Sequence, residues 1–216
     1  MKISILCSDK DHPIYLKLVE WEKKYSLFHS VELLSNKANL TGGDILFLIS
    51  CNEMIDKIER ANYHKVLVIH ASDLPKGKGW SPHIWQILNG ENEIIVSLIE
   101  AEDSVDSGAI WGQRKLLLEG HELCDEINNR LFNLEIELMD FAVEQFENIK
   151  PKLQRDIEPT YYKRRTPEDS MIDITKTLEE QFELLRVVDP KRYPAFFDFR
   201  GHRYIIRLEK IENIQP

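Results

Sequence analysis

Val66-Leu67-Val68-Ile69-His70 opens the stretch, residues 65–113, that best indicates how this chain folds. Its four apolar residues predict a buried strand, which ends on a polar side chain. A helix-like segment follows at 81–90, and a second apolar strand follows at 94–99. Open α/β sheets build their sites where parallel strands end. We therefore expect these two strands to be parallel, so that His70 meets the residues after the second strand at one sheet edge.

The preceding residues show the same alternation of strand and helix. A continuous apolar run at 44–50 predicts a strand that is buried on both faces. Ile14, Leu18, Trp21 and Tyr25 recur at the spacing of a helix whose apolar face is buried. Further strands are expected at 3–7 and 30–34, and further helices at 53–61 and 121–149. The predicted fold class is α/β, a Rossmann-like, mostly parallel twisted sheet with flanking helices.

The chain changes character after Lys150-Pro151, which ends the long helix. We take this point as the boundary between a main domain, 1–150, and a C-terminal appendage, 151–216. The appendage is expected to contain a charged loop, then a helix at 175–188 with Thr175 as its N-cap. Two apolar, aromatic segments flank Arg200-Gly201, which predicts a β-hairpin.

Composition excludes several classes of protein. The net charge of -9 disfavours nucleic acid as a partner, because phosphate binding needs a basic surface. The three cysteines are too widely spaced for a disulfide framework or a metal site, which favours a reduced, cytoplasmic protein with no metal. No apolar run has the length of a membrane span, so no membrane partner is expected. The first strand is not followed by Gly-x-Gly-x-x-Gly, so dinucleotide binding is unsupported.

The central stretch resembles the folate-dependent formyltransferases. The resemblance lies in His70-Ala71-Ser72-Asp73-Leu74-Pro75, then Gly79, Pro82 and Val105-Asp106-Ser107-Gly108, in the order and spacing of that family. The loop at 163–170, the following helix and the Pro194-Ala195-Phe196-Phe197 hairpin resemble the tail of sugar-nucleotide formyltransferases. The resemblance implies a formyltransferase catalytic domain at 1–150, 10-formyltetrahydrofolate as the formyl donor, and a nucleotide-linked amino deoxysugar for a surface glycan as the acceptor. It also implies a homodimer that forms through the hairpin.

Formyl transfer to an amine requires a group that handles a proton near neutral pH and a donor for the developing oxyanion. His70 suits the first role, since histidine titrates near neutrality, and Asp106 would orient it. Asp103 is the alternative carboxylate, but no glycine follows it closely to turn the loop back. The family has an asparagine two residues before the histidine, and here that residue is Val68. Asn52 or a backbone amide would have to replace it, or His70 would act alone.

The resemblance also assigns residues to the two ligands. Those expected to bind the folate are Ser50, Cys51, Asn52, Met54, Ile99, Glu102 and Asp103. Those expected to bind the acceptor are Ser72, Asp73, Lys78, Trp80, Lys163, Arg164, Arg165 and Phe197. Each has a structural alternative: Asp73 and the basic residues could be solvated, Trp80 could pack on the sheet, and Phe197 could be a core or dimer contact.

Three other functions remain open. A glycinamide ribonucleotide formyltransferase has a similar size but lacks this tail, and a methionyl-tRNA formyltransferase has a larger, basic C-terminal domain. The loss of the asparagine at Val68 keeps open a non-catalytic protein that binds folate or a nucleotide sugar.

Overall fold

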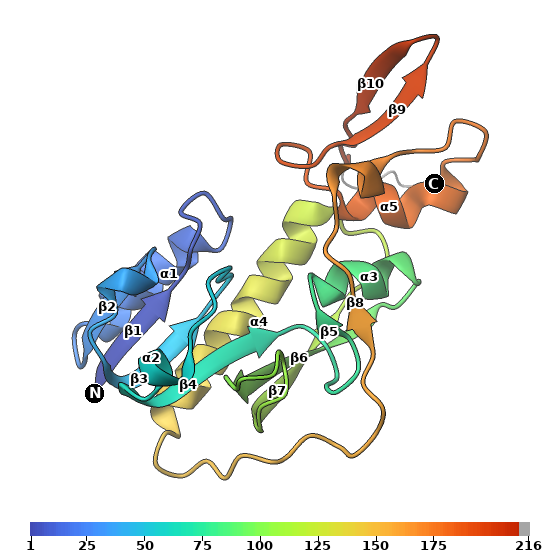
Figure 1. Ribbon diagram of the computed structural model, residues 1–216. Helices are drawn as coiled ribbons and strands as arrows, with labels where there is room; N and C mark the ends of the chain where they lie inside the picture. Colours follow the sequence, from blue (N-terminus) through green and yellow to red (C-terminus); the bar gives the residue numbers. More distant parts are fainter. Residues whose placement is uncertain (212–216) are drawn as a thin grey trace.

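A six-stranded sheet forms the centre of the computed structural model, which describes residues 1–211 (Figure 1). Its strands, in the spatial order β2-β1-β3-β4-β6-β7, are β1 (Lys2–Leu6), β2 (Ser30–Leu34), β3 (Gly43–Leu48), β4 (Tyr63–His70), β6 (Glu93–Glu100) and β7 (Ile110–Leu117). The first four in that order run parallel. The predicted α/β fold with a mostly parallel sheet is confirmed.

The direction of β6 differs from the prediction. β6 is antiparallel to β4, with His70 paired to Ser97 and Leu67 paired to Glu100. The reason lies in α3 (Pro82–Leu88), which stays beyond the carboxyl end of β4, where its Gln86 side chain donates to the Ala71 carbonyl. The chain therefore re-enters the sheet from that end. The residues after β6 leave it level with Leu67 and must turn back to reach His70.

The loop at 101–109 makes this turn. The Glu100 N–H donates to the Ala109 carbonyl at 3.0 Å, which closes the loop at its base. A Cβ on Gly108 would lie 1.8 Å from the Glu100 carbonyl oxygen, so only glycine permits this approach. Asp106 adopts a φ of 51°, in the left-handed region. The Asp-Ser-Gly sequence thus folds the loop back along the sheet.

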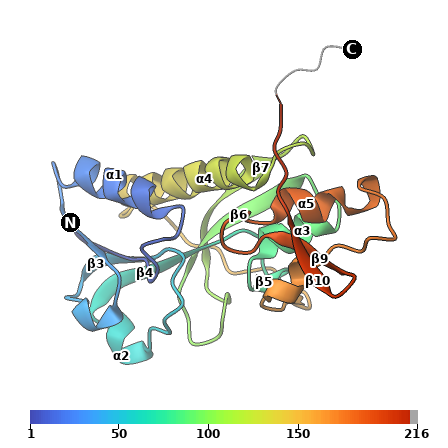
Figure 2. The ribbon, with the colours of Figure 1, turned by 90° about the horizontal axis from the view of Figure 1, so that it is seen from above.

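Helices cover both faces of the sheet (Figure 2). α1 (Tyr15–Tyr25) and α4 (Cys124–Glu144) lie on one face, and α2 (Lys57–Arg60) lies on the other. Trp21 packs edge-on against Phe47, and its indole N–H donates to Asp140 at 2.6 Å, which ties α1 to α4. α2 and α4 are shorter than predicted, and α2 begins at Lys57 because the Asp56 side chain caps it. Among residues 1–211, no helix has the length and apolar character needed to cross a membrane.

The chain after residue 150 runs along the main domain. Lys152 bridges to Ile110, and β8 (Tyr161–Tyr162) pairs in parallel with β5 (Lys78–Gly79). The remaining short elements are η1 (Lys37–Asn39), η2 (Pro167–Ser170), η3 (Glu179–Gln181), α5 (Phe182–Val187), β9 (Ala195–Phe199) and β10 (His202–Ile206). The predicted β-hairpin is confirmed, and it extends away from the sheet (Figure 1).

The predicted helix at 175–188 is shorter in the structure. It begins with η3 and continues as α5. Thr177, not Thr175, caps it, because the Thr177 hydroxyl accepts the N–H of Glu180 while the Thr175 hydroxyl donates to Asp173.

Candidate active site

His70 is buried at the end of β4, where both of its ring nitrogens face oxygen atoms. Nε2 lies 2.7 Å from the Gly77 carbonyl oxygen. A carbonyl only accepts hydrogen bonds, so Nε2 carries the proton and donates it. Nδ1 lies 3.5 Å from Oδ1 of Asp106. The imidazole is therefore held between the loop that follows β4 and the loop that follows β6.

Asp106 is fixed by backbone and side-chain contacts. Its second carboxylate oxygen accepts the Gly79 N–H at 2.8 Å, and its backbone carbonyl accepts from the Gln154 side chain at 2.8 Å. Asp103 lies elsewhere, because it forms an ion pair with Arg60, which lowers its pKa. The geometry thus brings Asp106, and not Asp103, to His70.

A set of polar side chains, of which Ser72 and Ser97 are buried, holds the turn after His70. Ser97 donates to the Ser72 carbonyl at 2.8 Å, and Gln113 donates to the Ser97 hydroxyl at 3.0 Å. The Ser72 hydroxyl is buried and has no partner within residues 1–211. Ser97 and Gln113 were not predicted from the sequence, although a serine inside the apolar strand at 94–99 was a usable signal.

Val68 lies in an apolar row of the sheet. Its partners on the adjacent strands are Leu48 and Ile99. Asn52, the suggested replacement for the family asparagine, is exposed, and its backbone N–H donates to the Ser8 hydroxyl. Within the described residues, both strand neighbours of Val68 are thus apolar.

The two segments expected to bind folate are linked by Arg60. Its guanidinium donates to the Ile55 carbonyl at 2.7 Å and pairs with Asp103, so the loop after β3 lies close to the loop after β6. Exposed members of these loops are Ser50, Asn52, Met54, Glu102 and Asp103. Cys51 is half-buried, and the Ile99 side chain lies in the core, so Ile99 can offer a ligand only its backbone.

Several basic groups gather near His70. Burial first, and then the positive charges of His70, His12 and Arg165, lower the pKa of His83 to about 4. The His12 ring lies 3.3 Å from the Ser50 hydroxyl, at the end of β3. His12 and His83 were not predicted as site residues, because nothing in their local sequence pattern marks them.

The residues expected to bind the acceptor divide into separate groups. The Arg164 guanidinium lies 4.7 Å from the exposed Trp80 ring, beside the β5–β8 pair. Lys163 lies 5.6 Å from the Trp85 ring and pairs with Asp169.

Three other candidates have protein partners or are enclosed. Arg165 donates to the Asp169 carbonyl, and its buried Nε atom has no partner within residues 1–211. Lys78 is buried. Asp73 is paired with Arg155 at 2.6 Å, and both side chains are partly exposed. 

Phe197 lies apart from this group. It stacks on Tyr204 at 5.2 Å within the β9–β10 hairpin, which extends away from the sheet (Figure 1).

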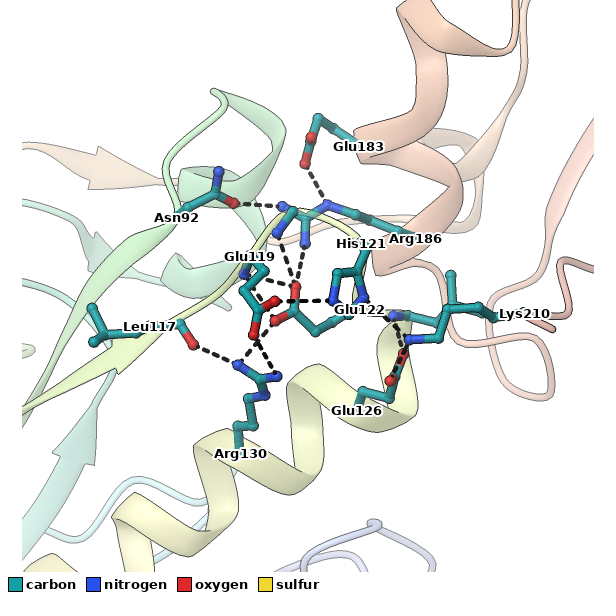
Figure 3. Close-up of polar contacts among 12 residues, drawn as sticks. Asn92, Leu117, Glu119, His121, Glu122, Glu126, Arg130, Glu183, Arg186 and Lys210 are labelled. Atoms are coloured by element: carbon teal, nitrogen blue, oxygen red, sulfur yellow. Dashed lines mark hydrogen bonds and ion pairs between the residues drawn. The ribbon is translucent and has the colours of Figure 1, made fainter. Parts of the chain in front are cut away.

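One cluster in the described chain has the composition of a metal site. Ligand atoms of Glu119, His121 and Glu122 lie within 4.8 Å of one another. The two carboxylates, however, are ion-paired with Arg130, and Glu122 also faces Arg186 (Figure 3). The arginine charges already compensate these acids, so the cluster fits a structural network better than a cation site.

Several solved structures are similar to this chain. The methionyl-tRNA formyltransferase of Clostridium thermocellum is 23% identical, with a TM-score of 0.82, covering 100% of this chain and 96% of that one. HypX from Aquifex aeolicus in complex with tetrahydrofolic acid is 20% identical, with a TM-score of 0.75, covering 96% of this chain and 37% of that one. A sugar N-formyltransferase from a Shewanella species is 16% identical, with a TM-score of 0.71, covering 98% of this chain and 99% of that one.

These structures share the fold of the chain over almost its whole length. The family model described as formyl transferase matches residues 4–143, a span that includes most of β1, His70, Asp106 and nearly all of α4. The chain belongs to the formyl transferase family.

Proposed function

We propose that this protein transfers a formyl group from 10-formyltetrahydrofolate to the amine of a nucleotide-linked amino deoxysugar. The observation that carries the proposal is the buried His70–Asp106 pair, which two loops hold at the edge of the sheet. A desolvated imidazole beside a carboxylate is suited to move a proton at a reacting amine. The acceptor class is supported by the tail motif and by the solved sugar N-formyltransferase with the same fold.

His70 is assigned the proton step. The attacking amine must lose a proton, and an imidazole with an oriented ring can accept it. Asp106 stabilises the imidazolium that forms. Its second oxygen accepts the Gly79 N–H, which fixes the orientation of the carboxylate relative to the imidazole ring. Nε2 already donates its proton to the Gly77 carbonyl. Nδ1, which faces Asp106, is therefore the ring nitrogen that can accept the proton from the amine.

The loops after β3 and β6 are assigned to the folate, which supplies the formyl group when bound. The fit rests on the exposed apolar side chains Met54 and Val105, one on each loop, which suit the faces of a flat heteroaromatic ring. Arg60 holds the two loops together through its contacts with the Ile55 carbonyl and the Asp103 carboxylate. The folate-bound HypX structure, which shares the fold, supports this choice of donor.

The β5–β8 pair and its neighbours are assigned to the nucleotide sugar. Trp80 with Arg164 offers an aromatic face and a guanidinium, groups that suit a nucleobase and a diphosphate. Binding of a nucleoside diphosphate, measured by calorimetry, tests this assignment. Arg164→Ala is expected to weaken binding, whereas unchanged affinity would make the loop a solvated surface.

A homodimer through the hairpin is part of the proposal. Phe199, Tyr204 and Ile205 are exposed on β9 and β10, and an isolated two-stranded hairpin is marginal in water. A second copy would cover these side chains. We also retain the division into a catalytic domain at 1–150 and an appendage at 151–216.

The alternative function is a binding protein without turnover. It is favoured by Val68, which leaves the sheet edge without the family's polar side chain. Incubation with 10-formyltetrahydrofolate and a panel of nucleotide-linked amino sugars, followed by mass spectrometry, separates the two. Formylated product supports the enzyme, and binding of both ligands without product supports the alternative.

A further inference from the structure

The segment at 152–162 runs along the main domain on its way from α4 to the C-terminal elements (Figure 1). Backbone hydrogen bonds anchor both of its ends. At one end Lys152 and Ile110 exchange two of them, at 2.7 Å and 2.9 Å. At the other end β8 pairs with β5, and the Tyr162 carbonyl accepts the Trp80 N–H at 3.2 Å. These anchors determine where the side chains between them can reach.

Gln154 holds the loop that carries Asp106. Its side-chain nitrogen lies 2.8 Å from the Asp106 carbonyl oxygen and 2.9 Å from the Gly108 carbonyl oxygen, and it donates to both. An amide nitrogen has two hydrogens, so these two bonds use both of them. The backbone of Asp106 has a φ of 51°, which is uncommon for a residue other than glycine. Gln154 therefore stabilises, from outside the loop, the conformation that brings the Asp106 side chain to His70.

Thr160 holds the turn on the other side of the imidazole. Its hydroxyl accepts the Gly77 N–H at 2.8 Å, and its carbonyl accepts the Lys78 N–H at 2.9 Å. A trans peptide is planar, and its C=O and N–H point in opposite directions. Holding the Lys78 N–H on one side therefore directs the Gly77 carbonyl to the other, where it accepts from His70 Nε2 at 2.7 Å.

The β5–β8 anchor also reaches Asp106. Gly79, the last residue of β5, donates its N–H to the second carboxylate oxygen of Asp106 at 2.8 Å. A Cβ on Gly79 would lie 2.4 Å from the Tyr162 carbonyl oxygen, so only glycine lets β8 pair this closely. The Gly77 carbonyl, the Gly79 N–H and the Asp106 backbone, which together orient the His70–Asp106 pair, are thus all held by one segment.

We propose that Gln154 and Thr160 are positioning residues for formyl transfer, which hold the His70–Asp106 pair in the geometry that accepts a proton from the amine. This inference rests on the proposed function. Neither residue has to touch a ligand, because each acts through the backbone around the pair. The segment lies beyond residues 4–143, which the family model matches. The C-terminal part of the chain therefore completes the proton-transfer site, in addition to binding the acceptor.

Steady-state kinetics on isosteric variants test the inference. Thr160→Val keeps the shape of the side chain but removes the acceptor, and Gln154→Met keeps the length but removes both donors. Each should lower kcat about tenfold to a hundredfold, because a misplacement of about 1 Å at a reacting group costs roughly the larger factor. KM for the acceptor should stay within about twofold, since ground-state binding is untouched. Thr160→Ser, which keeps the hydroxyl, should recover most of the parental kcat.

Leu153→Ala is the control, because Leu153 lies on the same segment and is 87% exposed. It should leave kcat and KM unchanged. Calorimetry with a nucleoside diphosphate counts the binding sites per chain, and Gln154→Met should have as many as the parent. Combined with His70→Asn, Gln154→Met should slow the reaction little further, because residues that act through one another are not additive.

Three outcomes would overturn the inference alone. Parental kcat in folded Gln154→Met or Thr160→Val would remove that residue from the assignment. A fall in kcat matched by a fall in the number of binding sites would make the residues structural. The same fold-loss from Gln154→Met with and without His70 would show that it does not act through the imidazole. A parent that formylates no amino sugar would instead overturn the proposed function, and the positioning role with it.

Discussion

Replacing Arg186 with methionine is expected to loosen the attachment of the C-terminal segment. Arg186 is fully buried in α5. Its guanidinium donates to Asn92 at 3.0 Å and to Glu183 at 2.6 Å, and it faces the fully buried Glu122, beside the start of α4, at 3.9 Å (Figure 3). The side chain therefore connects α5 to two parts of the main domain.

The magnitude follows from what remains after the substitution. Removing one partner of a buried ion pair costs about 3–5 kcal/mol, because the other charge is left uncompensated. Here Glu122 keeps Arg130 at 2.9 Å and the backbone N–H groups of Glu119 and Gly120. We therefore expect Arg186→Met to lower the free energy of unfolding by about 3 kcal/mol, the lower end of this range. That is a large share of the roughly 5–15 kcal/mol that keeps a domain folded.

Urea unfolding followed by circular dichroism measures this loss. The control is Lys115→Met, since Lys115 pairs with Glu93 at 2.6 Å but the two side chains are 60% and 55% exposed. Exposed pairs contribute about 0–1 kcal/mol, so the control should unfold close to the parent. Equal losses in the two variants would refute the claim that burial of Arg186 holds the segment in place.

Three further predictions concern the site and the assembly. Val68→Asn should not increase turnover greatly, because the asparagine would enter an apolar row between Leu48 and Ile99; strong activation, seen in initial rates, would favour the binding-protein alternative. The contribution of Glu135 to the stability of the parent should fall as pH rises from 4.5 to about 8, because burial raises its pKa and the folded state holds a proton on Glu135 that the unfolded state releases. Glu135→Gln should remove a few kcal/mol of that fall in a pH series of denaturant curves, and identical curves for both proteins would contradict it. Light scattering at micromolar concentration should give a dimer mass, which a clean monomer mass would reject.

The sheet could be predicted because its signals are local. Apolar runs such as 44–50 bury both faces wherever they lie, and alternation with helices indicates a parallel arrangement. The direction of β6 could not be predicted in this way. It depends on where α3 packs, and that is set by contacts such as Gln86 to Ala71. The cap of the last helix, in contrast, had a sequence signal, since Glu180 follows Thr177 by three residues in the capping-box pattern, and the structure shows that contact.

The site shows the same limit. The resemblance to the formyltransferases and the chemistry of formyl transfer suggested His70 and Asp106, and the structure places them together through a loop that turns back along an antiparallel strand. Ser97 and Glu135 each interrupt an apolar pattern, and that interruption was the available signal. Whether such a residue is a satisfied core group, like Ser97, or an unpartnered one, like Glu135, depends on contacts from distant parts of the chain.

The most direct test of the proposed function is the rate of formylated product formation by the parent and by His70→Asn. Both proteins would receive 10-formyltetrahydrofolate and a nucleotide-linked amino sugar that the panel shows to be accepted, with product counted by mass spectrometry. The account predicts that His70→Asn folds normally and is at least about a hundredfold slower, the usual effect of losing an acid–base group. A folded His70→Asn protein that forms product at nearly the parental rate would contradict it.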